Sequence, residues 1–135
     1  MEIYKKSYAG IFVWTLFLMA ALLGAAWLPI EELHLQILVT LNITSVMIAL
    51  LLLLIWENER VYWISGVTFE QAKNASSQER RTYAWRHFKR FALFTLAFGL
   101  YSVLAWVLQF PYALSIILFI AGLTAAALST NKIRL

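Results

Sequence analysis

The chain has 135 residues, of which 62% are hydrophobic, only 13% are charged and none is cysteine. Soluble domains carry about a quarter charged residues, so this composition excludes a disordered chain and argues against a soluble globular domain. The absence of cysteine excludes disulfides, thiolate metal sites and iron–sulfur clusters. We therefore expect an integral membrane protein in which spanning segments take up most of the chain.

Four apolar runs follow one another along the chain, and each is close to the roughly 20 residues that a helix needs to cross a bilayer. They cover about 8–30, 33–56, 91–110 and 111–130, and none contains Asp, Glu, Lys or Arg between its ends. A transmembrane β-barrel would show short alternating segments instead. The sequence therefore predicts an all-α membrane protein, with four spanning helices in an up-down bundle that forms one domain over 1–135.

The only sizeable segment outside these runs is the loop over 57–89. Thr68 with Gln71, and Ser76 with Glu79, have the spacing of capping boxes, in which two side chains satisfy the free amides at the start of a helix. We expect a short helix over about 69–74. A second helix should begin near Ser77 and continue into the third span, so that this helix covers about 77–110.

The positive charges predict the orientation of the chain. All 11 Lys and Arg lie on one side of the predicted membrane: two before the first span, seven between the second and third, and two after the fourth. The opposite side carries Glu31 and Glu32. The positive-inside rule then places both termini in the cytoplasm. We expect a multi-pass protein of a cytoplasmic, bacterial membrane.

The loop between the second and third spans is both basic and aromatic in its last part, over 78–90. One interpretation is an anchor, whose long side chains reach lipid phosphates. The other is a docking surface for a cytoplasmic partner or a specific anionic lipid. Nucleic acid is not an expected partner, because the basic residues flank membrane segments. The residues predicted to make these contacts are Arg80, Arg81, Arg86, Lys89 and Arg90.

Small and polar residues recur at helical spacing in three of the spans, as expected where helices pack closely in lipid. The first span offers Gly10, Ala21 and Gly24, with the bulky Trp14 and Phe17 between them; the third offers Thr95, Gly99, Ser102, Trp106 and Gln109; the fourth offers Ser115, Gly122, Ala126 and Ser129. We expect these faces to pack against each other in one bundle. The alternative is that one of them, such as that of the fourth span, faces another subunit.

The second span carries most of the polar side chains. Gln36, Thr40 and Thr44 share one face, while Asn42 points in another direction and is the most polar group near mid-membrane. An unsatisfied amide is costly in hydrocarbon, so Asn42 needs a hydrogen-bond partner. This partner is expected on another helix, and the open alternative is a lipid or substrate.

Several classes of chemistry lack the residues they need. The spans contain no acidic or basic side chain for ion-coupled transport. His34 and His87 are predicted at opposite membrane faces, so they cannot ligate one haem. Glu31, Glu32 and His34 are a weak metal-ligand pattern, and we expect no Ser–His pair at one depth for nucleophilic catalysis. The sequence therefore predicts neither an enzyme nor a cofactor or metal site.

What remains is a non-enzymatic accessory, assembly or regulatory subunit, which binds another membrane protein or itself and contacts membrane lipids with anionic head groups. The alternative is a small homo-oligomeric transporter or channel for a lipid or an apolar solute. A channel would line its pore with Gln36, Thr40 and Thr44. A lipid route would need a groove open to the bilayer beside Asn42 or beside Thr40 and Thr44.

Overall fold

The computed structural model describes residues 4–135, and within this range the regular structure is entirely helical. Four helices are long and apolar enough to cross a membrane, which confirms the predicted spans. They are α1 (Ala9–Ala26), α2 (Leu33–Asn58), α4 (Ser77–Val107) and α5 (Tyr112–Ser129). Shorter elements join or follow them: η1 (Val61–Trp63), α3 (Phe69–Asn74) and η2 (Thr130–Lys132).

Two of the long helices end earlier than hydropathy indicates. The helix α1 stops at Ala26, three residues before Pro29, which cannot donate a helical hydrogen bond. The helix α4 stops at Val107, because Gln109 has a left-handed φ of 57° shortly before Pro111. The apolar character continues through both ends, so composition alone overestimates these helices by a few residues.

Both predicted capping boxes are present. Thr68 Oγ1 accepts from the amide of Gln71 at 3.2 Å, and Gln71 Oε1 accepts from the amide of Thr68 at 2.9 Å. Ser76 and Glu79 make the same reciprocal pair at 3.1 and 2.6 Å. These caps start α3 and α4, and α4 then continues unbroken for 31 residues, as the spacing predicts.

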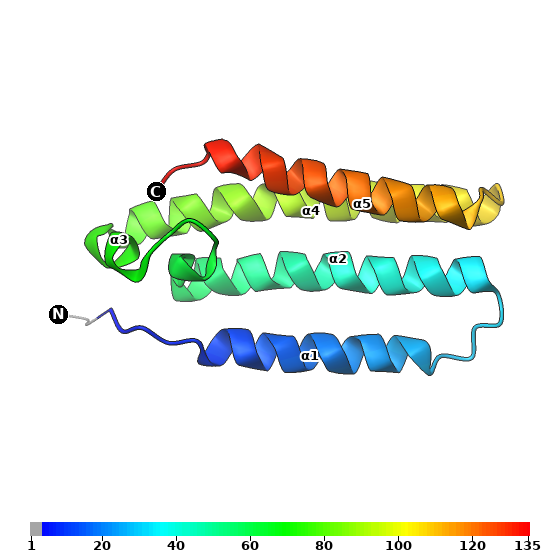
Figure 1. Cartoon of the computed structure of the whole chain (residues 1–135), viewed down its shortest axis with the longest axis horizontal. Helices are drawn as coiled ribbons and strands as arrows, with labels where there is room; N and C mark the ends of the chain where they lie inside the picture. Colours follow the sequence, from blue (N-terminus) through cyan, green and yellow to red (C-terminus); the bar gives the residue numbers. More distant parts are fainter. Residues whose placement is uncertain (1–3) are drawn as a thin grey trace.

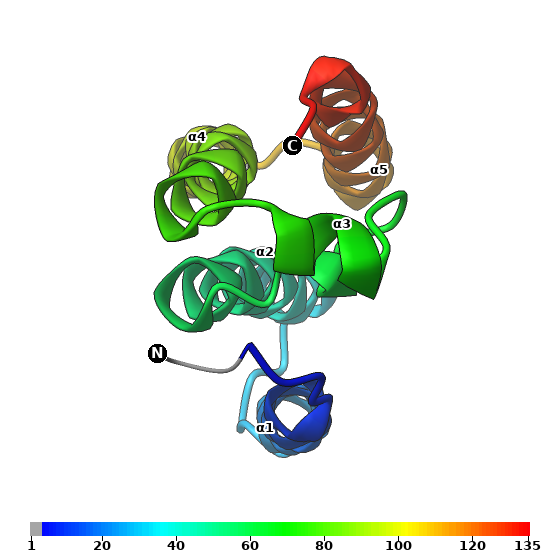
Figure 2. The same cartoon turned by 90° about the vertical axis from the view of Figure 1, so that its left-hand side faces the viewer.

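Figure 1 shows the long helices lying side by side, with the α1–α2 and α4–α5 connections at one end. The helix α3 and the C-terminus lie at the other end, together with the start of the described chain. In the end view, α2 occupies the middle, with α1 on one side and α4 and α5 on the other (Figure 2). The helix α2 packs against α1, α4 and α5, whereas α1 makes its main contact with α2.

The helix α1 therefore lies outside the core that the other three helices share. Gly10 fits against Trp63, where a Cβ would come within 2.5 Å of the indole ring. No atom of another element lies within 4 Å of such a Cβ at Gly24, and Phe17 is 66% exposed. The expectation that Gly10, Ala21 and Gly24 form one packing face is wrong at Gly24, because this residue lies on the open side of α1, whereas its neighbour Ala25 is buried.

Most of the buried apolar side chains form two clusters. One gathers α2, η1, α3, the start of α4 and the C-terminal segment around Ile55, Val61 and Tyr83. The other joins α2, α4 and α5 through Leu38, Phe98 and Phe119. The helix α5 approaches α4 at Gly122, as expected for a small residue in a helix contact. There a Cβ would lie 2.6 Å from the ring of Phe94.

This close approach predicts opposite results for two glycine substitutions. Gly122→Ala should lower the free energy of unfolding by about 1–3 kcal/mol, because the new methyl group displaces Phe94 from its ring contacts. Gly24→Ala should have no unfavourable effect, because the space there is open and alanine favours helix. Thermal unfolding in detergent micelles measures both variants, and a smaller loss at Gly122 than at Gly24 would contradict the packing.

Candidate functional site

The contact between α2 and α4 carries a row of hydrogen bonds inside the predicted membrane region. Asn42 Nδ2 donates to Ser102 Oγ at 2.8 Å and to the carbonyl of Leu38 at 2.7 Å. Further along the same contact, Thr95 Oγ1 lies 3.3 Å from the carbonyl of Ser45. The amide nitrogen of Asn42 therefore has its partner on α4, which is one of the two arrangements that the sequence left open.

The oxygen of the same amide is not satisfied in this way. No donor among residues 4–135 forms a hydrogen bond with Asn42 Oδ1. A different oxygen, Gln36 Oε1, is the fully buried side-chain atom without a partner in that range. Gly99 lies next to this oxygen, since a Cβ there would be 3.7 Å from it. The acceptor thus sits beside a position without a side chain, at the surface of the α2–α4 contact.

A groove runs along this contact with a volume of about 400 Å³. We call it the Asn42 groove, and its lining residues are Leu35, Leu38, Val39, Asn42 and Ile43 of α2 and Gly99, Ser102, Val103 and Trp106 of α4. Asn42 and Ser102 supply its polar groups, apart from the indole N–H of Trp106. The hydroxyl of Ser102 is already used, because it donates to the carbonyl of Phe98 at 2.7 Å. The groove is therefore apolar with one available acceptor.

The polar face of α2 formed by Gln36, Thr40 and Thr44 points elsewhere, toward α1. Gln36 Nε2 donates to the carbonyl of Ala25 at 2.7 Å. The hydroxyls of Thr40 and Thr44 donate to carbonyls one turn earlier in α2, each at 2.9 Å. These polar groups serve the α1–α2 contact and the helix itself, so α1 lies against the face that a channel would use to line a pore.

A second polar cluster, at the end where α2 and α5 begin, corrects the expectation that no serine and histidine share a depth. His34 Nε2 lies 2.8 Å from Ser115 Oγ, and the hydroxyl of Tyr101 lies 2.9 Å from the same oxygen. Ser115 is completely buried, so its oxygen is not accessible to a substrate and instead joins α2, α4 and α5. The positions of these residues in the sequence could have predicted this contact. The helices α2 and α5 start at the same end of the bundle, and His34 is the second residue of α2 while Ser115 is the fourth residue of α5.

Gln109 is exposed at the end of α4, and its Nε2 donates to the carbonyl of Trp106 at 2.8 Å. It therefore terminates the helix and takes no part in the α2–α4 contact. Gly122 packs on Phe94 within the α4–α5 contact. Of the nine intramembrane residues predicted from the sequence, the structure brings Asn42, Thr95, Gly99 and Ser102 together along one contact; the other five lie elsewhere.

The five basic residues that were predicted to contact a lipid or a partner fall into two groups. Arg80 is held within the fold: it pairs with Glu59 at 3.1 Å, donates to the carbonyls of Ala72 and Ala75, and lies 4.2 Å from the ring centre of Tyr4. Arg81 lies 3.7 Å from the same carboxylate and 5.2 Å from the ring centre of Trp56.

The second group consists of Arg86, Lys89 and Arg90. These side chains are exposed, and none of them forms a salt bridge with any residue of the described chain. They are therefore the members of the predicted set that are available to a ligand. Arg80, by contrast, is a structural residue at the centre of the loop.

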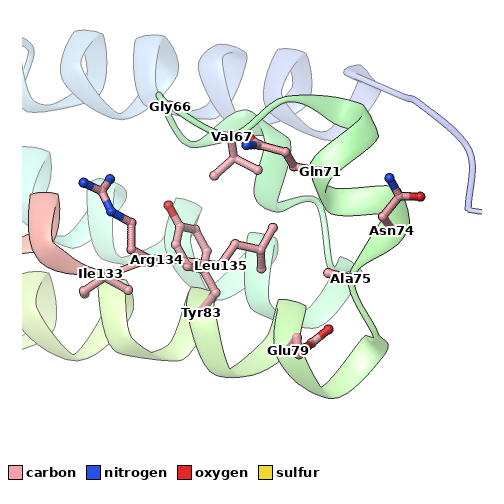
Figure 3. Close-up of a pocket in the computed structure, with 10 residues that line it drawn as sticks. All are labelled: Gly66, Val67, Gln71, Asn74, Ala75, Glu79, Tyr83, Ile133, Arg134 and Leu135. Atoms are coloured by element: carbon pink, nitrogen blue, oxygen red, sulfur yellow. The ribbon is translucent and has the colours of Figure 1, made fainter.

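A polar cavity of about 450 Å³ lies nearby, between α3, the start of α4 and the C-terminal segment (Figure 3). Two of its polar side chains, Gln71 and Glu79, already accept hydrogen bonds from helix-capping amides. Figure 3 shows Tyr83 and Arg134 on the opposite side of the cavity from Asn74. The Glu79 carboxylate at this cavity therefore also stabilises the start of α4.

Comparison with known proteins adds no relative: no protein-family model, curated protein or solved structure matches the chain.

The division of the basic residues predicts unequal effects on stability. Arg80→Gln should lower the free energy of unfolding by about 2 kcal/mol, because it leaves Glu59 and two carbonyl groups without their donor. Arg86→Gln should change it by less than about 0.5 kcal/mol, since this side chain is exposed and unpaired. Unfolding followed by tryptophan fluorescence compares them, and equal losses would overturn the division.

The contacts of Tyr4 predict a dependence on alkaline pH. Its hydroxyl donates to the carbonyl of Glu59, its ring stacks on Phe69, and burial raises its pKa from 10.0 to about 12 despite the nearby charge of Arg80. The unfolded chain ionises this tyrosine more readily, so the free energy of unfolding should fall as the pH rises from about 10 to about 12.

In Tyr4→Phe this part of the pH dependence should be absent, whereas Tyr112→Phe, at an exposed tyrosine, should keep it. Unfolding measured at several pH values across this window provides the comparison. Identical slopes for the wild type and Tyr4→Phe would contradict the burial of the Tyr4 hydroxyl.

Proposed function

We propose that this chain is a non-enzymatic accessory subunit of a membrane complex, and that it binds its partner through the Asn42 groove. The segments that carry all of its Lys and Arg lie at the end of the bundle that holds α3 and the C-terminus. The positive-inside rule supports placing this end in the cytoplasm, with both chain ends inside. A cytoplasmic, bacterial membrane is the location that we propose.

The observation that carries the proposal is the available oxygen of Asn42 in an apolar groove. A carbonyl group without a donor in hydrocarbon costs about 1–3 kcal/mol relative to a paired one. The bilayer core offers no water to pair with it. An occupant that brings an O–H or N–H group to this point recovers that energy, so the groove favours a ligand with a donor.

The dimensions of the groove favour a transmembrane helix as that occupant. Its lining extends from Leu35 to Ile43, which corresponds to about 12 Å or two turns of helix. Gly99 provides a place where a second backbone can approach closely, as small residues do in membrane helix contacts. A partner helix with Ser, Thr, Asn or Gln opposite Gly99 would fill the groove and donate to Asn42.

A lipid or apolar solute is the second candidate, and the apolar lining of the groove favours it. A lipid route requires a groove beside Asn42 or beside Thr40 and Thr44. A lipid that fills it would also need a donor, such as a hydroxyl or amide group at mid-membrane depth. Most acyl chains lack one, which is why we place a protein helix first.

Photocrosslinking in the native membrane tests this proposal. The chain has no cysteine, so Val103→Cys introduces a single attachment point for a benzophenone inside the groove. Leu96→Cys places the same probe on α4 outside the groove, at a comparably exposed side chain. We expect a protein adduct of one defined mass from position 103 and none from position 96. Lipid adducts alone at both positions would contradict the docking of a helix.

Two further variants separate recognition from folding. Ser102→Ala removes the bond between α2 and α4 but keeps Asn42 Oδ1, whereas Asn42→Leu removes both. In a membrane protein such a bond contributes only about 0.6 kcal/mol on average, so both variants should remain folded. The adduct from position 103 should persist in Ser102→Ala and disappear in Asn42→Leu. Its persistence in Asn42→Leu would rule out the role proposed for the oxygen.

A further inference from the structure

A second pocket, at the basic end of the bundle, has a different character from the Asn42 groove. It lies between α4 and the segment that follows α5, and it has a volume of about 630 Å³. We call it the basic pocket, and its lining residues are Arg86, Lys89, Arg90 and Leu93 of α4 with Lys132 and Ile133 of the C-terminal segment. Four of these six side chains are cationic, and none is acidic.

The charges of the basic pocket are not neutralised within the described chain. Both salt bridges of residues 4–135 involve Glu59, which pairs with Arg80 and Arg81 and with no residue of the basic pocket. The four cations therefore line one pocket without a counter-ion from residues 4–135. Such an arrangement is stabilised by an anionic ligand that several of them contact together.

The position of Lys132 is fixed by the core of the protein. Ile133, its neighbour, is 8% exposed and packs into the cluster around Ile55, Val61 and Tyr83. Its amide also donates to the carbonyl of Thr130 at 3.0 Å, within the turn of η2. The backbone that carries Lys132 is thus held beside α4, and the two elements form the pocket together.

The face of α4 that supplies the cations continues into the predicted membrane as an apolar strip. Arg86, Lys89 and Leu93 are spaced at three and four residues and share this face. Leu93, Leu96 and Leu100 continue it and are among the most exposed leucines of the chain, at 69%, 69% and 71%. A ligand in the basic pocket can therefore extend along these leucines.

We propose that the basic pocket binds a phospholipid whose head group carries two phosphate charges, with its acyl chains along Leu93, Leu96 and Leu100. Basic pockets between membrane helices at the cytoplasmic face recognise head groups of this kind. A single phosphodiester would balance only one of the four cations. The inference goes beyond the proposed docking of a helix, because it concerns another site and another ligand.

Spin-labelled lipids in phosphatidylcholine vesicles that contain the full chain test the proposal. Their electron paramagnetic resonance spectra give the association of each lipid relative to the host lipid. We expect diphosphatidylglycerol, with two phosphates, to associate about tenfold more strongly than phosphatidylglycerol, which has one. Equal association of the two lipids, or displacement of the labelled lipid by millimolar inorganic phosphate, would overturn the choice of a dianionic lipid.

Matched lysine pairs test the location of the site. Lys89→Gln with Lys132→Gln should weaken the association of diphosphatidylglycerol by about 30-fold, since each basic residue near a membrane surface contributes about fivefold. Lys5→Gln with Lys73→Gln removes the same charge from exposed positions outside the pocket and should change it by less than about twofold, because neither side chain would contact the bound head group.

Lys89→Arg with Lys132→Arg should restore the association, because it restores the charge. Equal weakening by the two glutamine pairs would show a general attraction of the basic surface for anionic lipid and would overturn the pocket. A loss in the arginine pair as large as in the glutamine pair at the same positions would also contradict it. These outcomes do not depend on whether a partner helix occupies the Asn42 groove.

Discussion

The contact between α2 and α4 is the interaction on which the rest of the structure depends. The helix α2 packs against all three other long helices, and its most extensive contact is the one with α4. Hydrophobic burial does not drive helices together in lipid, so close packing and polar bonds must hold this contact. The bond from Asn42 to Ser102, the weaker contact of Thr95 Oγ1 with the carbonyl of Ser45 and the absence of a side chain at Gly99 provide them.

The same contact gives the chain its candidate recognition site. An amide has a donor and an acceptor side, and α4 satisfies only the donor side of Asn42. The acceptor side is left at the apolar Asn42 groove. Asn42 therefore has a structural role through its nitrogen and a proposed binding role through its oxygen. The effect of an Asn42 substitution must for this reason be compared with that of Ser102→Ala, which removes only the structural bond. The helix α1 packs on another face of α2 and leaves the groove uncovered.

At the basic end, the fold depends on one carboxylate. Glu59 binds Arg80 and contacts Arg81, and its backbone carbonyl accepts from Tyr4, so it connects the N-terminal segment, the end of α2 and the start of α4. It lies in the left-handed region at the end of α2, with a φ of 59°. Glu59 pairs with Arg80 and Arg81 and with none of the four cations of the basic pocket.

Local features of this chain could be predicted from its sequence, whereas the partners of its polar side chains could not. Hydropathy identified four spans because each contains a continuous apolar run, and the capping boxes at Thr68 and Ser76 involve residues only three positions apart. The bond between Asn42 and Ser102 joins residues 60 positions apart, and it depends on how α2 and α4 are aligned along their axes.

The same limit applies to the basic residues. A list of Lys and Arg does not reveal that Arg80 turns inward to Glu59, because that pairing depends on how the loop closes over 21 positions. It also does not reveal that Lys132 and Lys89 line the same pocket, because one lies in α4 and the other follows α5. Fold class follows from composition, while sites follow from helix register.

The central claim is that the Asn42 groove receives a helix of another membrane protein. Native mass spectrometry of the chain, gently extracted from its source membrane, tests this claim most directly. We expect a second protein at fixed stoichiometry with the wild type and with Ser102→Ala, and its loss with Asn42→Leu. Recovery of the chain alone or as a homo-oligomer, with only lipid or a small molecule attached, would contradict the claim and favour the transport alternative.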